Sequence, residues 1–234
     1  MSDEQSFLEQ YEAQDWPKPS VTVDLVVLTV IDTDLKVLLI QRGGHPEKGK
    51  WALPGGFVDV GDGVRDQGED LEHAAHRELE EETGLARGSC YLEQLYTFGK
   101  AYRDPRLRVI TVAWYALVPS DLAPRVVAGD DAADARWVSV TEAVDLAFDH
   151  DAIVACALER VRNKVDYTPI AFRLVPPLFT QAELRAVYEA IKGETYDARN
   201  FSRRFRRMQT DGVIERGPGK RPTRTRPAAV YRYR

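Results

Sequence analysis

The segment from residue 63 to residue 85 has the sequence GVRDQGEDLEHAAHRELEEETGL and carries the most specific pattern in the chain. Strong helix formers at helical spacing predict a helix over residues 71–83. In that helix Glu78, Glu81 and Glu82 fall at positions i, i+3 and i+4, so their carboxylates share one face. Like charges this close repel one another, and a stable helix gathers them only around a counter-ion.

A hard divalent cation such as Mg²⁺ prefers these oxygen ligands and would bridge them to phosphate oxygens of a bound molecule. Glu69, Glu78, Glu81 and Glu82 are therefore the candidate metal ligands, and Glu81 and Glu82 the candidate catalytic residues if the site is active. Arg77 lies one turn before Glu81 and is placed to orient it. The alternative is a solvated acidic helix, but the fixed spacing and the apolar strands on either side favour a site.

The pattern Gly-x5-Glu-x7-Arg-Glu-apolar-x-Glu-Glu-x-Gly-apolar, filled from Gly63 to Leu85, resembles the Nudix box. The resemblance includes residues 38–42 and 51–58 and covers about residues 21–162. It implies an α/β/α sandwich on a mixed sheet and a ligand in which a nucleoside diphosphate is linked to another group. In enzymes of that family the box glutamates bind metal and help to activate a water that attacks phosphorus.

The chain departs from that family's pattern at the box glycine. Family members usually supply it from a double glycine, but here Gly55-Gly56 lies several residues earlier and residues 60–68 look like an insertion. Either Gly63 or Gly56 therefore occupies the glycine position. The placement of Glu69 beside the metal cluster depends on how the insertion folds.

Aromatic and basic residues outside the box are candidates for a nucleotide pocket. Phe57, Tyr102 and Trp51 are suited to stacking on adenine, and the arginines to binding phosphates, although Trp51 and Phe57 also fit a core. The polar segment 103–106, between two apolar strands, is a stronger candidate than any single aromatic. The predicted ligand-binding residues are Arg42, Phe57, Arg77, Tyr102, Arg103 and Arg106. The four histidines have no metal-ligand spacing and are interpreted as surface or hydrogen-bonded residues.

The rest of the first 165 residues alternates between apolar strands and helical patterns. Strands are predicted over 21–31, 36–41, 91–98, 108–118 and 137–140, a helical region from Thr141, and a second helix over 149–164.

The 234-residue chain has a net charge of −5 that is very unevenly distributed. From Asp197 to the end, twelve basic residues face three acids, which gives +9 there and leaves −14 for everything before it. Such a division indicates two regions with different partners. A solvated basic tail is the alternative.

The C-terminal region has the element order of a winged helix-turn-helix. Thr180 and Glu183 predict a capping box for a helix to about Lys192, and Asp197 is placed to cap a second helix to about Thr210. Residues 213–215 and 230–232 can then pair as a hairpin around a loop rich in Gly, Pro and Arg. Helix, turn, basic helix and hairpin together favour DNA binding.

In the second helix an apolar face leaves basic and polar residues toward solvent, where arginine can contact guanine and phosphate in a major groove. The hairpin would contact the backbone or the minor groove. The predicted DNA-binding residues are Arg199, Asn200, Ser202, Arg203, Arg206, Arg207, Lys220, Arg221 and Arg224. The alternatives are a surface for RNA, for an acidic partner or for the acidic Nudix domain itself.

Taken together, the sequence predicts an α+β chain: an N-terminal segment (1–20), a Nudix-like domain (21–165) and a winged helix-turn-helix domain (166–234). This combination resembles the Nudix-related transcriptional regulators, which in bacteria repress NAD biosynthesis and salvage. The resemblance implies ADP-ribose or a related NAD metabolite as ligand and a homodimer on a palindromic double-stranded DNA operator. Ligand binding would change the spacing of the two DNA-binding heads.

Two functions remain open. One is a repressor of NAD metabolism genes whose Nudix site senses its ligand. The other is an active, Mg²⁺-dependent ADP-ribose pyrophosphatase with an accessory basic domain. The intact glutamates favour hydrolysis, the helix-turn-helix order favours the repressor, and we favour sensing. Two isolated cysteines, the absence of an apolar run of about 18 residues and an acidic N-terminus predict free thiols, no membrane span, no signal peptide and a cytoplasmic protein.

Overall fold

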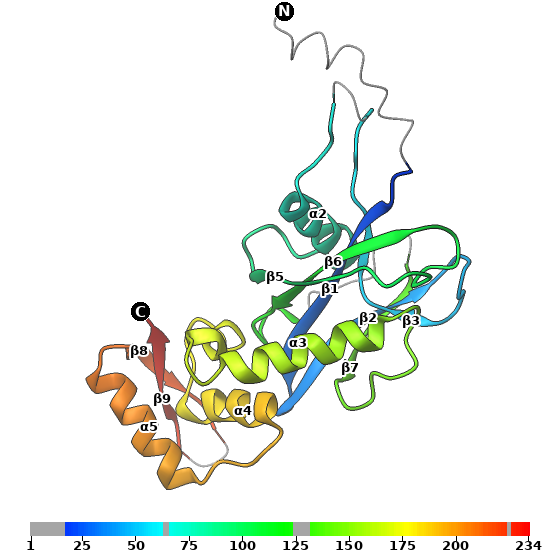
Figure 1. Cartoon of the computed structure of the whole chain (residues 1–234). Helices are drawn as coiled ribbons and strands as arrows, with labels where there is room; N and C mark the ends of the chain where they lie inside the picture. The colour runs from blue at the N-terminus through cyan, green and yellow to red at the C-terminus, as the bar shows by residue number, and fades with distance from the viewer. Residues whose placement is uncertain (1–16, 63–65, 124–131, 224–225) are drawn as a thin grey trace, which may run out of the picture.

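The computed structural model describes residues 17–62, 66–123, 132–223 and 226–234 (Figure 1). Its N-terminal part is built on a seven-stranded mixed sheet, and its C-terminal part holds two helices and a two-stranded hairpin. The elements are β1 (Ser20–Ile31), β2 (Asp34–Arg42), β3 (Trp51–Ala52), β4 (Gly55–Phe57), α2 (Leu71–Thr83), β5 (Tyr91–Phe98), β6 (Val109–Leu117), β7 (Ala132–Ser139), α3 (His150–Lys164), η3 (Pro169–Arg173), α4 (Gln181–Lys192), α5 (Ala198–Thr210), β8 (Ile214–Arg221) and β9 (Ala228–Tyr233).

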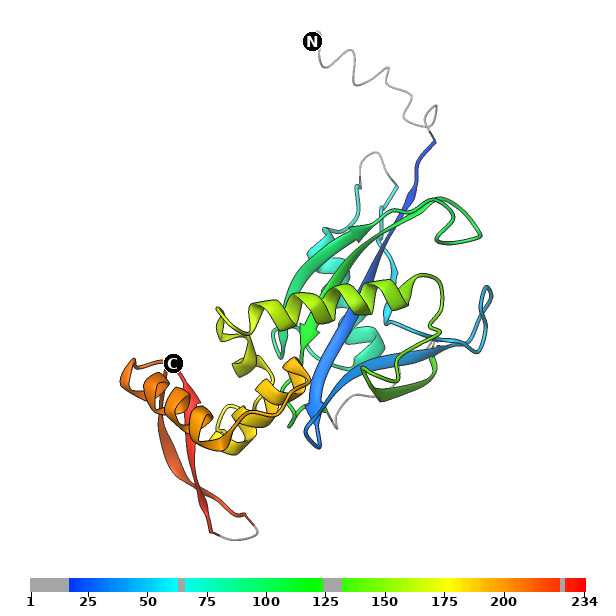
Figure 2. The same ribbon diagram turned by 60° about the horizontal axis from the view of Figure 1, so that its bottom comes forward.

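The large sheet has the strand order β3-β2-β1-β6-β5, with β4 also paired to β1 and β7 to β2. Strands β1 and β6 are parallel, and the other pairs are antiparallel. Because side chains alternate along a strand, β1 supplies both faces: Leu25 packs in the cluster beneath α2, and Leu28 packs in the cluster beneath α3. The two helices therefore cover opposite faces of the sheet, which confirms the predicted α/β/α sandwich (Figure 2).

The helix that carries the Nudix-like pattern is confirmed, and one predicted helix is wrong. Helix α2 spans residues 71–83 and ends at Gly84, whose φ of 70° is the left-handed conformation that favours glycine at this position. Residues 141–148, predicted to start a helix, form turns instead. Asp145 and Phe148 both have a φ of 56°, which interrupts any run of helical backbone hydrogen bonds before α3 begins.

The C-terminal unit has the predicted winged helix-turn-helix order. Thr180 and Glu183 form the capping box of α4, and the side chain of Asp197 accepts a hydrogen bond from the backbone N–H of Asn200 at the start of α5. The hairpin of β8 and β9 follows, longer than predicted, and a backbone bridge from Phe179 to Tyr231 ties it to the segment before α4.

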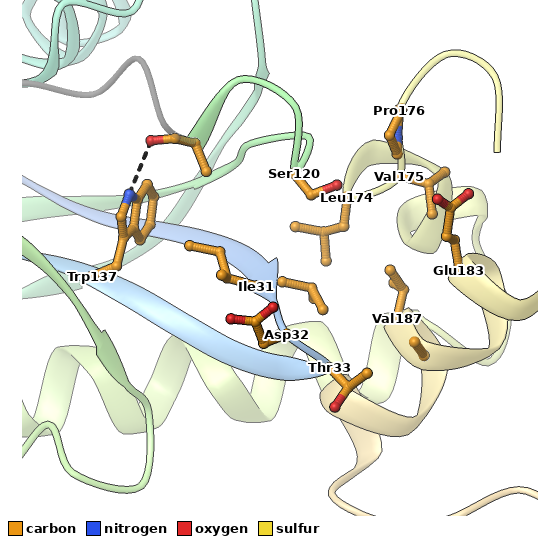
Figure 3. Close-up of a pocket in the computed structure, with 13 residues that line it drawn as sticks. Ile31, Asp32, Thr33, Ser120, Trp137, Leu174, Val175, Pro176, Glu183 and Val187 are labelled. Carbon is orange, nitrogen blue, oxygen red and sulfur yellow. Dashed lines mark hydrogen bonds between the residues drawn. The ribbon is translucent and has the colours of Figure 1, made fainter. Parts of the chain in front are cut away.

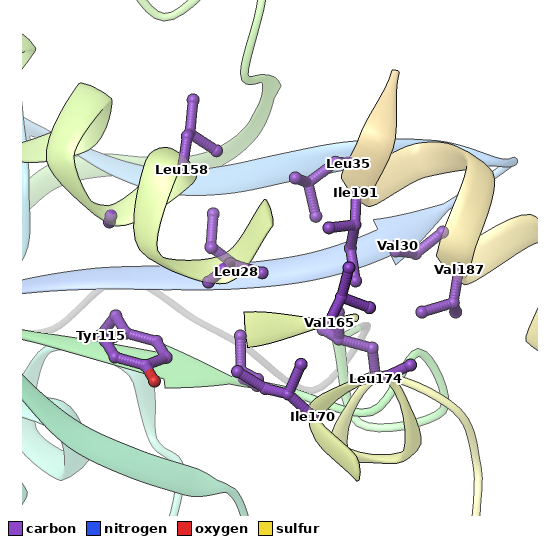
Figure 4. Close-up of a cluster of buried hydrophobic side chains, with 14 of the residues drawn as sticks. Leu28, Val30, Leu35, Tyr115, Leu158, Val165, Ile170, Leu174, Val187 and Ile191 are labelled. Atoms are coloured by element: carbon purple, nitrogen blue, oxygen red, sulfur yellow. The ribbon is translucent and has the colours of Figure 1, made fainter. Parts of the chain in front are cut away.

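The two parts of the chain share one hydrophobic cluster. Val30 and Leu35, at the β1–β2 turn, pack in the same cluster as Leu174, Val187 and Ile191 of the C-terminal part (Figure 4). Because residues on both sides of position 165 belong to this one cluster, the domain boundary between residues 165 and 166 stays a prediction. No helix in the described part of the chain is long and apolar enough to span a membrane.

Candidate nucleotide cleft and DNA-binding surface

A cleft of about 180 Å³ opens beside the N-terminal half of β1. Strands β2 and β4, the loop between β5 and β6 and the start of α3 form its other walls, so segments far apart in the sequence meet there. It is lined by Thr22, Asp24, Ile40, Arg42, Leu53, Gly55, Gly56, Phe57, Arg103, Asp104, Arg106, Val109, Phe148 and His150. Four of the six predicted ligand residues, Arg42, Phe57, Arg103 and Arg106, line it together.

Arg103 is fixed at the floor of this cleft. Its side chain is only 5% exposed and lies between two carboxylates. The guanidinium donates to Asp149 in two hydrogen bonds of 3.0 and 2.6 Å and to Asp24 in one of 3.2 Å. Such a bidentate pair holds the arginine in one orientation in the wall of the cleft.

His150 is a buried neutral group of the same floor. Its Nδ1 accepts a 2.9 Å hydrogen bond from the backbone N–H of Leu53, and its Nε2 lies 3.7 Å from a carboxylate oxygen of Asp24. Burial lowers the pKa of His150, so the ring is uncharged at neutral pH. His150, predicted to be a surface or hydrogen-bonded residue, is buried here, and Asp24 and Asp149 were not among the predicted site residues. The available signal was a charged residue inside the apolar run of β1.

The rim of the cleft holds the other cations and aromatics. Arg42 donates to the carbonyl of Pro46 over 3.0 Å, and its guanidinium carbon lies 4.7 Å from the centre of the Phe148 ring. Burial and neighbouring Arg106 lower the pKa of Arg42. Arg106 is oriented by a 2.7 Å bond to Asp104 and lies over the ring of Phe57 at 5.7 Å.

Two predicted ligand residues lie elsewhere. Tyr102 is 94% exposed and does not line the cleft. Arg77, on α2, donates to the carbonyl of Phe57 over 3.2 Å and otherwise pairs with the box glutamates. Trp51 packs against the core and lies under Arg136, whose guanidinium is 3.8 Å from its ring centre.

Arg77 is the centre of the acidic cluster. It contacts carboxylate oxygens of Glu69 at 2.6 Å, Glu78 at 2.8 Å and Glu81 at 3.0 Å. Hydrogen bonds from Arg77 hold the pKa of Glu69 below its usual value, whereas burial raises the pKa of Glu78. Glu82 is half-buried on the same helix. The counter-ion that the cluster requires is therefore supplied here by an arginine.

The donor set of this cluster suits a hard cation, but its arrangement is not that of a metal site. In the described residues no group of three His, Cys, Asp or Glu side chains converges closely enough to hold a metal ion. Nudix hydrolases generally use divalent metals. A cation bound here would share these carboxylates with Arg77, because each carboxylate has two oxygens and Arg77 contacts only one oxygen of Glu78 and one of Glu81.

The insertion is closed at its base, so Glu69 reaches the cluster despite it. The backbone N–H of Glu69 donates to the carbonyl of Asp59 over 3.0 Å, and the N–H of Asp59 donates to the Glu69 carboxylate over 3.0 Å. Gly68, with a φ of 78°, lies directly against Asp59, where an added Cβ would come within 2.0 Å of that carbonyl.

Of the two candidates for the box glycine, Gly56 lies directly against the acidic cluster. A Cβ at this position would lie 2.3 Å from a carboxylate oxygen of Glu78, so a side chain there would have to displace that carboxylate. Gly63, the alternative, lies outside the described residues.

The second candidate surface is the outer face of α5. Phe201 and Phe205 are buried against the rest of the unit, while Arg199, Asn200, Arg203, Arg206 and Arg207 are exposed. The guanidinium of Arg203 donates to the side-chain oxygen of Asn200, and Arg206 donates to the carbonyl of Ser202 over 3.3 Å. A row of oriented cations thus lies along one helix face.

Three other predicted DNA-binding residues have distinct surroundings. Ser202 accepts a 2.7 Å bond from Gln181 at the start of α4, and Lys220 is exposed on the hairpin. Arg221 is not free, because it pairs with Glu183 of the capping box and donates to the carbonyl of Leu178 over 2.7 Å. Its role here is to fasten the hairpin to α4. Arg224 lies outside the described residues.

The sandwich, the arginine-lined cleft and the exposed basic helix define a Nudix-domain protein with a winged helix DNA-binding unit. The comparisons agree with this class. The family model of the NUDIX domain matches residues 21–160, and that of the NrtR DNA-binding winged helix domain matches residues 171–233.

Similarity to known proteins extends over almost the whole chain. An ADPR responsive transcriptional repressor NtrR from Acinetobacter baylyi is 40% identical over 99% of this chain and 89% of its own length. The crystal structure of Shewanella oneidensis NrtR complexed with a 27mer DNA has a TM-score of 0.75 at 33% identity, covering 92% of this chain and 93% of that one. The NUDIX domain of Shewanella oneidensis NrtR complexed with ADP ribose has a TM-score of 0.54 at 32% identity, covering 68% and 99%. The chain therefore belongs to the family of Nudix-related transcriptional regulators that includes these repressors.

Proposed function

We propose that this protein is a DNA-binding transcriptional repressor of NAD metabolism genes that senses ADP-ribose, or a closely related nucleotide, in its Nudix cleft. The observation that carries the proposal is the exposed arginine face of α5, joined through a shared hydrophobic cluster to a cleft lined by arginines. The printed functions of the A. baylyi and S. oneidensis relatives support both halves of it.

The cleft has the chemistry that a nucleoside diphosphate requires. Arg42, Arg103 and Arg106 place positive charge on one side of a small concave site, which suits the two phosphates. Phe57 and Phe148 offer aromatic faces for the base or a ribose. We assign phosphate binding to Arg103 first, because its carboxylate partners fix it before any ligand arrives.

On DNA, α5 would enter the major groove and the hairpin would lie along the backbone. We assign base contacts to Asn200 and Arg203, which are held side by side near the N-terminal end of the helix. Arg199, Arg206, Arg207 and Lys220 would mainly meet phosphates, with Ser202 beside them. Arg221 would act indirectly by holding the hairpin in place.

A single α5 covers only half of a palindromic site, so we propose that the protein acts as a homodimer and, like other DNA-binding repressors, in the cytoplasm. ADP-ribose would then act through its different affinity for two dimer geometries. Only one of these would hold the two helices at the spacing of the operator.

A second function, ADP-ribose hydrolysis, is favoured by the retained carboxylates of α2. Glu69, Glu78, Glu81 and Glu82 would hold Mg²⁺, which neutralises phosphate charge and lowers the pKa of a bound water. Arg77 orients three of these carboxylates and would share them with the metal. Because no three of these carboxylates converge closely enough to hold a metal ion in the described part of the chain, we propose that sensing is the main activity and turnover is slow.

One titration separates the two functions. A fluorescent duplex from the region upstream of the protein's own gene is titrated with protein, and ADP-ribose is added with and without Mg²⁺ while its breakdown is followed by chromatography. Salt-sensitive DNA binding that intact ADP-ribose reverses supports the repressor. Rapid hydrolysis without specific DNA binding refutes it and identifies an enzyme.

Three variants assign the surfaces. Arg203→Ala should weaken operator binding by about 1–3 kcal/mol and relax its sequence preference, whereas Arg207→Ala should weaken binding to all sequences and lower the salt slope. Glu81→Gln should abolish any Mg²⁺-dependent hydrolysis and leave DNA binding without ligand unchanged. Unaltered DNA binding by both arginine variants would contradict the assignment of α5.

A further inference from the structure

A second cavity, of about 350 Å³, lies at the joint between the Nudix sheet and the winged helix unit (Figure 3). The β1–β2 turn, the segment after β6 and Trp137 of β7 form one wall. Residues 174–176 and helix α4 form the other. It is lined by Val30, Ile31, Asp32, Thr33, Ser120, Ala123, Trp137, Leu174, Val175, Pro176, Glu183, Ala186 and Val187. Its volume is in the range of about 300–1,000 Å³ that small-molecule sites occupy.

The lining of this joint cavity is apolar apart from two carboxylates and two hydroxyls. Asp32 and Glu183 contribute carboxylates, and Thr33 and Ser120 contribute hydroxyls. Among the described residues that line the cavity there is no Lys, Arg or His. Trp137 supplies an aromatic wall, and its indole N–H donates to the carbonyl of Ala123 over 3.1 Å. An anion such as ADP-ribose is therefore disfavoured here, in contrast to the arginine-lined cleft. An apolar body that carries a positive charge suits the joint cavity.

Glu183 connects the joint cavity to the DNA-binding hairpin. One of its carboxylate oxygens accepts a 2.7 Å bond from the backbone N–H of Thr180 in the capping box of α4. The other pairs with Arg221 of β8. The same side chain thus faces the cavity and holds the base of the wing. A cation in the cavity would compete with Arg221 for this carboxylate.

We propose that the joint cavity is a second ligand site, specific for a small aromatic or alicyclic cation, whose occupation weakens DNA binding. The regulatory part of this inference rests on the proposed repressor function. A ligand between the two walls acts in two ways: it favours one orientation of α4 against the sheet, and it draws Glu183 away from the wing. Both effects change affinity for DNA without contact with the ADP-ribose cleft.

Binding is tested first, without DNA, with benzamidinium as the probe and benzoate as a control of the same shape and opposite charge. The protein is labelled with 5-fluorotryptophan, and the ¹⁹F signal of Trp137 is assigned with Trp137→Phe. Benzamidinium should shift this signal in a saturable manner, and benzoate should not. Equal shifts by both probes, or no shift by either, overturn the proposal.

Variants then locate the probe. Ala186→Phe should fill the cavity and abolish the shift, while Ala186→Ser leaves the space open and should retain it. Asp32→Asn should weaken benzamidinium binding about threefold, the scale of one partly exposed charge pair, and Glu142→Gln, an exposed carboxylate outside the cavity, should not. If Ala186→Phe fails to fold, the Asp32→Asn and Glu142→Gln pair still decides the question.

The effect on DNA is measured by anisotropy at ten times the probe's Kd, with sodium benzoate at equal concentration to match ionic strength. Benzamidinium should weaken DNA binding about threefold or more, with a limit of about elevenfold if DNA-bound protein excludes the probe. The loss should disappear in Ala186→Phe. A protein that binds DNA and responds to ADP-ribose but not to benzamidinium refutes the second site alone. A protein that binds benzamidinium but never DNA refutes the repressor function instead.

Discussion

Replacing Arg103 with methionine should destabilise the protein severely, because two buried carboxylates depend on it. Asp24 and Asp149 are 10% and 23% exposed, and both accept hydrogen bonds from this guanidinium. Breaking a buried ion pair by removing one partner costs about 3–5 kcal/mol, since the remaining charge is left unpaired. Asp149 reaches solvent in part, so we expect the lower end, about 3 kcal/mol. Arg108→Met, at an exposed arginine after the same loop, is the matched control.

The measurement is urea unfolding at pH 7 followed by circular dichroism, with isothermal titration of ADP-ribose on the folded variant. The double variant Arg103→Met/Asp149→Asn should recover part of the loss, because it removes one of the stranded charges. ADP-ribose affinity should fall in both variants. A loss below about 1 kcal/mol for Arg103→Met, comparable to that of an exposed ion pair, would refute the reasoning that this network is buried and mutually dependent.

Three further predictions concern the acidic cluster. Gly56→Ala should cost about 1–3 kcal/mol in thermal unfolding, because the new methyl meets a carboxylate 2.3 Å away, whereas Gly44→Ala, with nothing within 4 Å, should be neutral. Deleting residues 61–67 should leave the melting temperature within a few degrees and retain ADP-ribose binding; loss of folding would show that the insertion is structural. Arg77→Gln should lower the free energy of unfolding by about 2 kcal/mol at pH 7. Because Arg77 lowers the pKa of Glu69, this difference should shrink as pH falls below the ordinary glutamate value of about 4.3, and a pH-independent difference would contradict the pairing.

The deletion follows from how the insertion closes. Joining Val60 to Gly68 gives the four-residue sequence Asp59-Val60-Gly68-Glu69, in which the existing bond from the Glu69 N–H to the Asp59 carbonyl becomes that of a β-turn. Glycine would occupy the third position, where a type II turn requires positive φ, and Gly68 already has a φ of 78°. The inserted residues thus lengthen a turn whose two ends are already in place.

Local signals explain why much of the fold could be predicted. The capping box at Thr180 and Glu183, the glycine after α2 and the alternating faces of β1 are encoded by residues close together in sequence, and each appears where expected. The residues after Thr141 carry a similar helical pattern, but the left-handed backbone at Phe148 overrides it. Here the tertiary packing that brings Phe148 into the cleft outweighs the helix propensity of the segment after Thr141.

The parts that could not be predicted depend on pairing between distant segments. Asp24, Arg103 and Asp149 come from three elements, and only the fold shows that they form one network. The tethering of Arg221 to Glu183 is of the same kind, since composition alone makes every arginine of the tail equivalent. Sequence identified the types of residue that bind phosphate, but not which of them were already committed to protein partners.

The shared hydrophobic cluster between the Nudix sheet and α4 has a mechanical consequence. A flexible tether would let each DNA-binding head search independently and would absorb any movement of the sheet. A packed joint does the opposite: a rotation of the sheet is transmitted to α4 through the shared cluster and becomes a larger displacement at the far end of α5, except where the joint cavity leaves α4 room to shift. The size of the response to ligand therefore depends on how firmly the hydrophobic cluster that contains Val30 and Val187 holds α4 against the sheet.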